Sequence, residues 1–162
     1  MTYYLTRREQ LEWRLDFERF IVEGRPNVAL TLGAGLACKI ENLHKAADFF
    51  FKKMHREAYG RNWYKRGSAE GVIAVGFVEH AQSNMHMHLA VRAPTPEARS
   101  ALERGEETWK DLRRGAHYHY ASLISAEDYA RYITKDSWRP EVRETFYVFK
   151  RDDREGPTKR IR

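Results

Sequence analysis

Two histidines separated by one residue lie in the segment Met85-His86-Met87-His88-Leu89. In a β-strand alternate side chains share a face, so His86 and His88 point one way while the apolar residues around them point the other. Two imidazoles at this spacing can bind one divalent ion, and Glu79, seven residues before His86, can supply a third ligand from a partner strand. Such a His-His-Glu set with open positions is typical of a catalytic metal, because a closed structural zinc site needs four protein ligands.

Three alternatives remain open for this pattern. The two histidines can instead cover a solvated sheet face, because a His-x-His strand alone is a weak signal. His80 competes with Glu79 as third ligand, and a twist or bulge at the end of the strand would exchange the two. His117 and His119 form a second alternate pair, but no carboxylate lies near them at comparable spacing, so hydrogen bonds or DNA contacts suit them better.

A predicted helix that begins at Ser125 carries two tyrosines, Tyr129 and Tyr132. Lys135 follows Tyr132 by three residues, which makes the phenol and the ammonium neighbours on the helix surface. A phenol has an unperturbed pKa of about 10, so a nearby cation must help it to act as a nucleophile at neutral pH. Helical phase places Tyr129 nearer the centre of the apolar stripe, where packing is the commoner role, and therefore favours Tyr132 as the nucleophile.

These motifs resemble those of the HUH endonucleases. The run Val75-Gly76-Phe77-Val78-Glu79, followed after six residues by His86-Met87-His88-Leu89-Ala90-Val91, is similar to the metal motif of parvovirus Rep nuclease domains. Tyr132-Ile133-Thr134-Lys135 resembles the tyrosine motif of circovirus, phage and plasmid rolling-circle Rep proteins, in the family's order. Residues 28–32 resemble the family's loosely defined first motif, so the resemblance covers residues 27–136.

The resemblance implies an α+β fold with a central antiparallel β-sheet, ferredoxin-like or RRM-like, flanked by helices. It also implies a mechanism in which Mn²⁺ or Mg²⁺ polarises a DNA phosphate and a tyrosine attacks it, giving a 5′-phosphotyrosine intermediate. Carried over to this chain, Glu79, His86 and His88 are the metal ligands, Tyr132 is the nucleophile and Lys135 is the assisting cation.

The implied function is sequence-specific nicking and joining of single-stranded DNA by a replication initiator. An HUH transposase or mobilisation relaxase, and a non-catalytic nucleic-acid-binding domain, are the alternatives. Some relatives use two tyrosines four residues apart, whereas Tyr129 and Tyr132 are three residues apart, so a catalytic role for Tyr129 stays open. The expected substrate is origin DNA in a stem-loop, and a helicase must act in trans because the chain contains no P-loop sequence.

Basic and aromatic side chains are interspersed between residues 49 and 66. Basic groups for phosphates and aromatic rings for bases suit single-stranded DNA, although a core helix with a solvated basic side gives the same pattern. The predicted DNA-binding residues are Lys52, Lys53, Arg56, Arg61, Trp63, Lys65 and Arg66.

Composition sets the frame for these motifs. A chain of 162 residues with 42% hydrophobic content indicates one domain, which we place at residues 1–152, before a charged tail at 153–162. The formal net charge of +6 favours an anionic partner. The single cysteine, Cys38, and an N-terminus without an apolar leader favour an intracellular location, in a bacterial cytoplasm or a virus-infected cell. The longest apolar run, residues 72–78, is too short to cross a membrane.

Periodicity and turn residues predict the elements that must position these side chains. Thr6 and Glu9 form a capping box at the start of the first helix, and Ser125 and Asp128 resemble one at the start of the last. A polar turn between residues 81 and 84 makes the flanking strands a β-hairpin. The predicted helices are residues 6–23, 41–58, 97–114 and 125–136, and the predicted strands are 28–32, 71–79, 85–89, 117–124 and 145–149.

Overall fold

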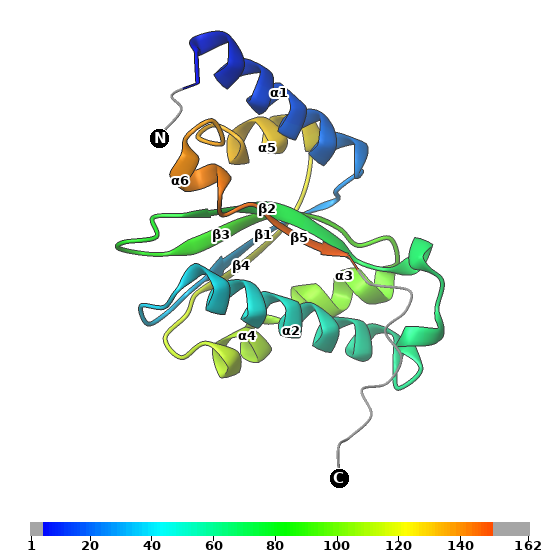
Figure 1. Ribbon diagram of the computed structural model, residues 1–162. Helices are drawn as coiled ribbons and strands as arrows, with labels where there is room; N and C mark the ends of the chain where they lie inside the picture. Colours follow the sequence, from blue (N-terminus) through cyan, green and yellow to red (C-terminus); the bar gives the residue numbers. More distant parts are fainter. Residues whose placement is uncertain (1–4, 151–162) are drawn as a thin grey trace.

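A five-stranded antiparallel sheet forms the centre of the computed structural model, which describes residues 5–150 (Figure 1). The strands are β1 (Val28–Gly33), β2 (Ile73–Glu79), β3 (His86–Arg92), β4 (Tyr118–Ser122) and β5 (Tyr147–Lys150). Their order in the sheet is β4-β1-β3-β2-β5, and every neighbouring pair is antiparallel. The predicted α+β class with an antiparallel sheet is therefore confirmed. The proposed domain boundary at residue 152 and the tail at 153–162 lie outside the described residues.

Helices cover both faces of this sheet (Figure 1). One layer contains α1 (Arg7–Glu23), α5 (Ala126–Ile133) and the short α6 (Pro140–Arg143), and the other contains α2 (Ile40–Tyr59), α3 (Pro96–Glu103) and α4 (Glu106–Leu112). Two short 3₁₀ helices, Trp63–Lys65 and Ser68–Glu70, connect α2 to β2. Among residues 5–150, no helix has the length and apolar character needed to cross a membrane.

The larger hydrophobic core lies between the sheet and the α2 layer. Met87, Leu89 and Val91 of β3 are fully buried there with Leu43 and Phe50 of α2. Their alternate spacing along the strand means that they leave the sheet on the same side. The apolar half of the His-x-His strand thus faces the core, as its sequence pattern predicts.

The other half of β3 faces the α1 and α5 layer. Ala90 packs there in a smaller core with Ala130 and Ile133 of α5. His86 and His88 have the same parity as Ala90, so their side chains leave the sheet toward this layer. The alternation of β3 therefore places both imidazoles on the side of the tyrosine-bearing helix.

Local hydrogen bonds explain where the helices of this layer begin. At α1 the Glu9 amide donates to the Thr6 hydroxyl over 3.3 Å, and the Thr6 amide donates to the Glu9 carboxylate over 2.7 Å. At α5 the Asp128 amide donates to the Ser125 hydroxyl over 3.1 Å. The capping box at Thr6 and the side-chain cap at Ser125 are confirmed, and such caps satisfy amides that have no partner within the helix.

The helix predicted over residues 97–114 is wrong in one respect, because the chain forms two helices with a break at Gly105. A Cβ at this position would lie 2.8 Å from the Phe50 ring, so only glycine permits the close approach to α2. The break lets Trp109 of α4 turn into the core, where it is fully buried against Phe50. Periodicity within a polar segment cannot reveal such a break, because the packing partner lies on a distant helix.

Candidate metal centre and tyrosine helix

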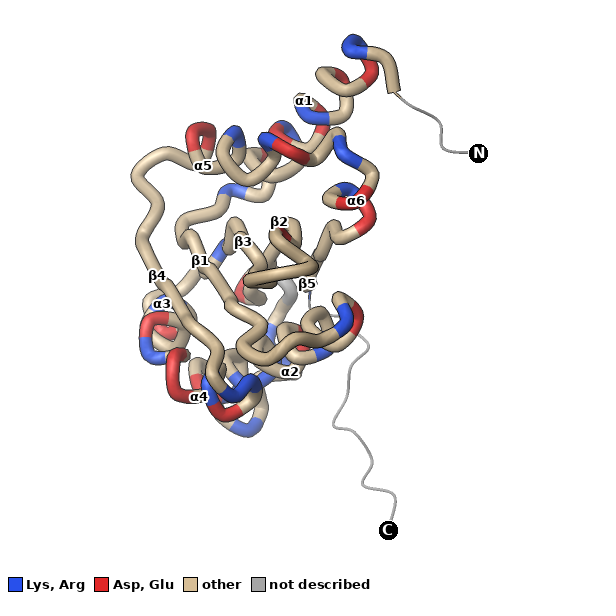
Figure 2. The backbone as a smooth tube through the Cα atoms, turned by 90° about the vertical axis from the view of Figure 1, so that its left-hand side faces the viewer, with Lys and Arg blue, Asp and Glu red and all other residues tan. Residues whose placement is uncertain are grey.

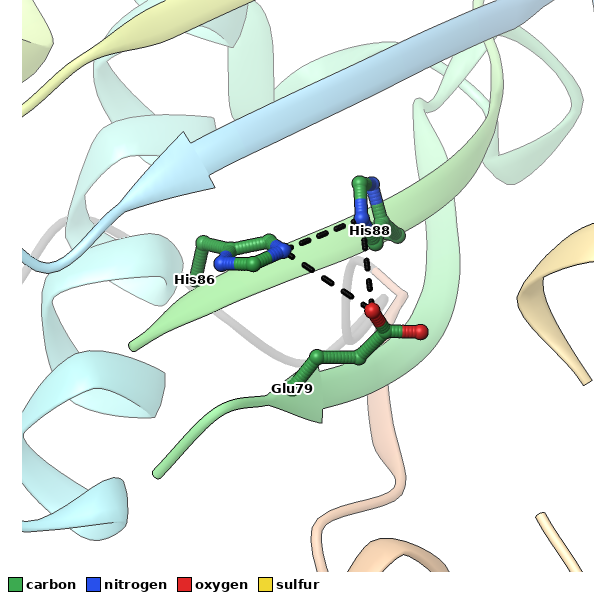
Figure 3. Close-up of side chains that lie close together, drawn as sticks. All are labelled: Glu79, His86 and His88. Atoms are coloured by element: carbon green, nitrogen blue, oxygen red, sulfur yellow. Dashed lines mark hydrogen bonds and ion pairs between the residues drawn. The ribbon is translucent and has the colours of Figure 1, made fainter. Parts of the chain in front are cut away.

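Glu79, His86 and His88 form one compact cluster at the turn end of the β2–β3 hairpin (Figure 3). Glu79 ends β2 and His86 begins β3, and the two residues are paired in the antiparallel register. The two imidazole Nε2 atoms are 3.1 Å apart, and Glu79 Oε2 lies 3.8 Å from that of His86 and 3.7 Å from that of His88. Within residues 5–150 this is the one group of three or more potential ligands that lies close enough to hold a metal ion.

The backbone at the end of β2 separates Glu79 from His80 in position. His80 adopts a left-handed conformation, with φ of 52°, and begins the turn in which the Ser83 amide donates to its carbonyl. Its ring is exposed and lies 5.4 Å from the His86 ring, outside the three-residue cluster. The geometry therefore favours Glu79 as the third ligand.

Hydrogen bonds behind the imidazoles determine which nitrogen each one presents. His86 Nδ1 lies 2.7 Å from the backbone carbonyl of Asn84, and because a carbonyl only accepts, this nitrogen carries the proton. The Nε2 atom of a neutral His86 then presents a lone pair to His88. His88 Nδ1 lies 3.1 Å from the Thr31 hydroxyl, which can accept in the same way.

The donor set fits a divalent cation. If both Nδ1 atoms are protonated, two Nε2 lone pairs face each other over 3.1 Å beside a carboxylate oxygen, and a positive charge is needed between them. Imidazole favours transition metals and carboxylate favours Mg²⁺ or Mn²⁺, so this mixed set can accommodate several divalent ions. Glu79, His86 and His88 could supply three ligands and would leave further coordination positions open.

Burial keeps the His88 imidazole neutral. Loss of hydration lowers the pKa of His88 to about 4, against an opposing effect of the Glu79 carboxylate. The positive charges of three neighbours also lower the pKa of His88, because they repel its proton; these neighbours are His86, Lys135 and His117. The neutral imidazole is the form that binds metal, so the site presents His88 ready for an ion at neutral pH.

Helix α5 brings Tyr132 to this cluster. Residue Tyr132 is 46% exposed, and its ring contacts the His88 ring at a centroid distance of 5.4 Å and an interplanar angle of 72°. Lys135 lies between Tyr132 and Glu79, since its ammonium is 4.5 Å from the Tyr132 ring centre and 3.7 Å from Glu79 Oε1. The structure thus brings together five of the residues selected from the sequence.

Tyr129 differs from Tyr132 in its surroundings. It packs against the smaller core with Ala130 and Ile133, 6.1 Å from the Tyr132 ring. Burial raises the pKa of Tyr129 above its ordinary value, with a smaller contribution from the charges of Tyr132 and Glu79. A phenol that resists ionisation is a poor nucleophile, so the geometry favours the packing role for Tyr129.

The predicted DNA-binding residues do not join the metal cluster. Lys52, Lys53 and Arg56 lie on α2, and Arg61, Trp63, Lys65 and Arg66 follow it. Helix α2 covers the opposite face of the sheet, and its C-terminal end lies across the sheet from the β2–β3 turn (Figure 1). Figure 2 shows Lys and Arg interspersed with Asp and Glu on helices of both layers, so charge alone marks no path for a DNA strand.

Several of these side chains have partners within the protein, and Trp63 and Arg66 show what such contacts do. The Trp63 ring stacks on His55 at a centroid distance of 5.6 Å. The Arg66 guanidinium lies 4.7 Å from the Tyr59 ring centre and 3.1 Å from a Glu70 carboxylate oxygen. Aromatic and basic residues in this segment therefore hold the connection between α2 and β2 together, whatever else they contact.

Sequence reasoning missed the site residues contributed by β1 and by the residue that precedes β4, His117. Thr31 pairs with His88 in the β1–β3 register, and Gly33 pairs with His86. The His117 ring packs over Gly33, because a Cβ added to Gly33 would lie only 2.3 Å from His117 Nδ1. The His117 ring centroid is 6.0 Å from that of His86. The sequence pairs His117 with His119 on a separate strand, and only the order of the strands shows that His117 neighbours His86.

Comparison with known proteins adds no relative to these observations. The chain matches no family model, no curated protein and no solved structure. What bears on its function is therefore the geometry of the cluster, together with the motifs that resemble those of HUH endonucleases.

Proposed function

We propose that this chain is a metal-dependent enzyme of the Rep type that nicks and rejoins single-stranded DNA through a tyrosine. The observation that carries the proposal is the meeting of two separate motifs at one place. Glu79, His86 and His88 form a three-ligand cluster, and Tyr132 contacts the His88 ring from a different element of the fold. Each motif alone has a structural explanation, but neither explanation requires them to meet.

The proposed roles follow from these contacts. A divalent ion held by Glu79, His86 and His88 would supply Lewis acidity to the scissile phosphate. The Tyr132 oxygen forms a bond to phosphorus while the bond from phosphorus to the 3′ oxygen breaks. The phenol loses its proton, and the departing 3′ oxygen gains one. The 5′ end stays on Tyr132 as a phosphodiester, so attack by a 3′-hydroxyl reverses the reaction and joins the strands.

Lys135 supports this step by its charge. Its ammonium lies beside both the Tyr132 ring and Glu79 Oε1, where a positive charge stabilises the negative charge that develops on the attacking oxygen or on the phosphate. Its ion pair with Oε1 leaves Oε2 directed toward the two imidazoles. A fixed charge of this kind stabilises a transition state most strongly where water is partly excluded.

The biological substrate that the HUH resemblance supports is a replication origin, with the nick in a single-stranded or stem-loop region. A helicase acting in trans would then provide unwinding, and the initiator would act inside a cell. A relaxase or transposase would use the same chemistry on another DNA. The cluster geometry supports the chemistry in all three cases, and the likeness of both motifs to those of Rep proteins supports the initiator.

The test is the formation of a covalent protein–DNA adduct. The full chain is incubated with Mn²⁺ and a labelled pool of single-stranded oligonucleotides of random sequence, and the products are separated under denaturing conditions. We expect an adduct with the unchanged chain, its loss with EDTA and in Tyr132→Phe, and its retention in the matched variant Tyr129→Phe.

Two results would contradict the proposal in different ways. An adduct that persists in Tyr132→Phe but disappears in Tyr129→Phe would mean that the nucleophile is wrong. DNA binding without any adduct, with either Mn²⁺ or Mg²⁺, would favour a non-catalytic nucleic-acid-binding domain.

A further inference from the structure

Strand β1 contributes a hydroxyl to the back of the metal cluster. The β1–β3 register places Thr31 directly opposite His88, and their side chains leave the sheet on the same face. The Thr31 hydroxyl lies 3.1 Å from His88 Nδ1. On the other side of the His88 ring, Nε2 points to His86 and Glu79.

A histidine ligand has two nitrogens, and the hydrogen bond at one of them decides which tautomer exists and where the other points. For His86 this bond goes to the Asn84 carbonyl, which belongs to the backbone of the hairpin turn. For His88 it goes to the side chain of Thr31, on a strand more than fifty residues away in the chain. One ligand is therefore oriented locally, and the other depends on a single replaceable hydroxyl.

We propose that Thr31 is a positioning residue of the metal centre, which accepts a hydrogen bond from His88 Nδ1 and so holds Nε2 toward Glu79 and His86. This inference rests on the metal centre of the proposed function. It adds β1 to the strands that build the centre and gives a physical role to a residue in the segment 28–33.

The competing explanation is that Thr31 is only a β-branched residue that suits a central strand. Two substitutions separate the explanations. Thr31→Val keeps the shape and the strand preference but removes the hydroxyl, whereas Thr31→Ser keeps the hydroxyl and removes the methyl group. A role in orienting His88 depends on the hydroxyl, and a packing role depends on the methyl group.

The experiment measures Mn²⁺ binding by the full chain without DNA, by titration calorimetry or by the electron paramagnetic resonance signal of free Mn²⁺. We expect Thr31→Val to bind Mn²⁺ about 10- to 100-fold more weakly, the usual effect of losing an outer hydrogen bond to a ligand. Thr31→Ser should bind nearly as well as the unchanged chain. Thr95→Val is the matched control, because Thr95 caps α3 on the other face of the sheet and its hydroxyl has no contact with the cluster.

Each outcome decides the matter. Equal affinity in Thr31→Val and the unchanged chain would overturn the inference alone, since the metal centre would still bind. Equal weakening in the valine and serine variants would assign Thr31 to packing and also overturn it. Failure of the unchanged chain to bind Mn²⁺ would overturn both the inference and the proposed function. Thr31→Ala offers a second deletion of the hydroxyl if thermal unfolding shows that the valine variant does not fold.

Discussion

Replacing Lys135 by methionine should move metal binding and DNA cleavage in opposite directions. The Lys135 ammonium lies 3.7 Å from Glu79 Oε1, while Glu79 Oε2 faces the two imidazoles. An ion held by Oε2 would thus share its ligand with a positive charge. Removing that charge favours the ion but leaves the Tyr132 phenol ring without its neighbouring cation.

The size of the effect on metal binding follows from Coulomb's law. If the ion lies on the order of 6 Å from the ammonium, charges of +2 and +1 repel by about 1.4 kcal/mol at the dielectric constant of water. The Lys135 side chain is 42% exposed, so this solvent-screened figure is more appropriate than the several-fold larger value of a protein interior. We therefore expect Lys135→Met to bind Mn²⁺ about tenfold more tightly at low salt, with the gain shrinking as ionic strength rises.

Cleavage should fall in the same variant by roughly 10²-fold or more, the usual effect of losing one charge-stabilising group. The assays are Mn²⁺ titration without DNA and the initial rate of adduct formation at saturating Mn²⁺. Lys135→Arg should retain both properties to a large extent. Arg131→Met, which removes an exposed cation paired with Asp128 on the same helix, is the matched control and should change neither.

The reasoning is refuted if Lys135→Met binds Mn²⁺ more weakly than the unchanged chain. That result would mean that Lys135 acts mainly by holding Glu79 in place. An unchanged rate of adduct formation would equally remove Lys135 from the chemical step.

Two further predictions concern β1. Gly33→Ala should fold, but its Cβ would take the place of the exposed His117 ring. The imidazole NMR signals of His117 and His86 should therefore shift while the melting temperature changes little. Unchanged signals would contradict the packing of His117 over Gly33. Trp109→Phe should lower the free energy of unfolding, measured in urea, by about 2 to 4 kcal/mol. The substitution shrinks a fully buried side chain and removes the 2.9 Å hydrogen bond that the Trp109 indole donates to the Gly33 carbonyl. A loss below about 1 kcal/mol would show that the core refills the space.

Local patterns were sufficient for the hairpin and its histidines. Alternation along residues 85–89 predicts that His86 and His88 share a face, and the polar turn predicts that Glu79 lies across from them. Both are confirmed by the register in which Glu79 pairs with His86. Such features can be read from sequence because they depend on neighbours in one strand or one turn.

Other parts of the site depend on residues far apart in the chain. The contact of Tyr132 with His88 rests on α5 packing against that face of β3, and the approach of His117 to His86 rests on β4 lying beside β1. The separation of the basic segment at Lys52 from the metal cluster rests on α2 covering the other face. Periodicity contains no information about strand order or about which face a helix covers, since long-range packing selects both.

The sequence by itself determined the residue types of the cluster, the common face of His86 and His88 on β3 and the helix that carries Tyr132, although this helix ends at Ile133 and Lys135 lies in the turn that follows. Only the tertiary structure decided that this helix lies over that face, that Glu79 and not His80 turns toward the imidazoles, and that Thr31 stands behind His88. The physical reason is the range of the forces involved. Strand alternation and helix caps act within a few residues, whereas the approach of β1, β3 and α5 comes from burying apolar surface between elements that the chain separates widely.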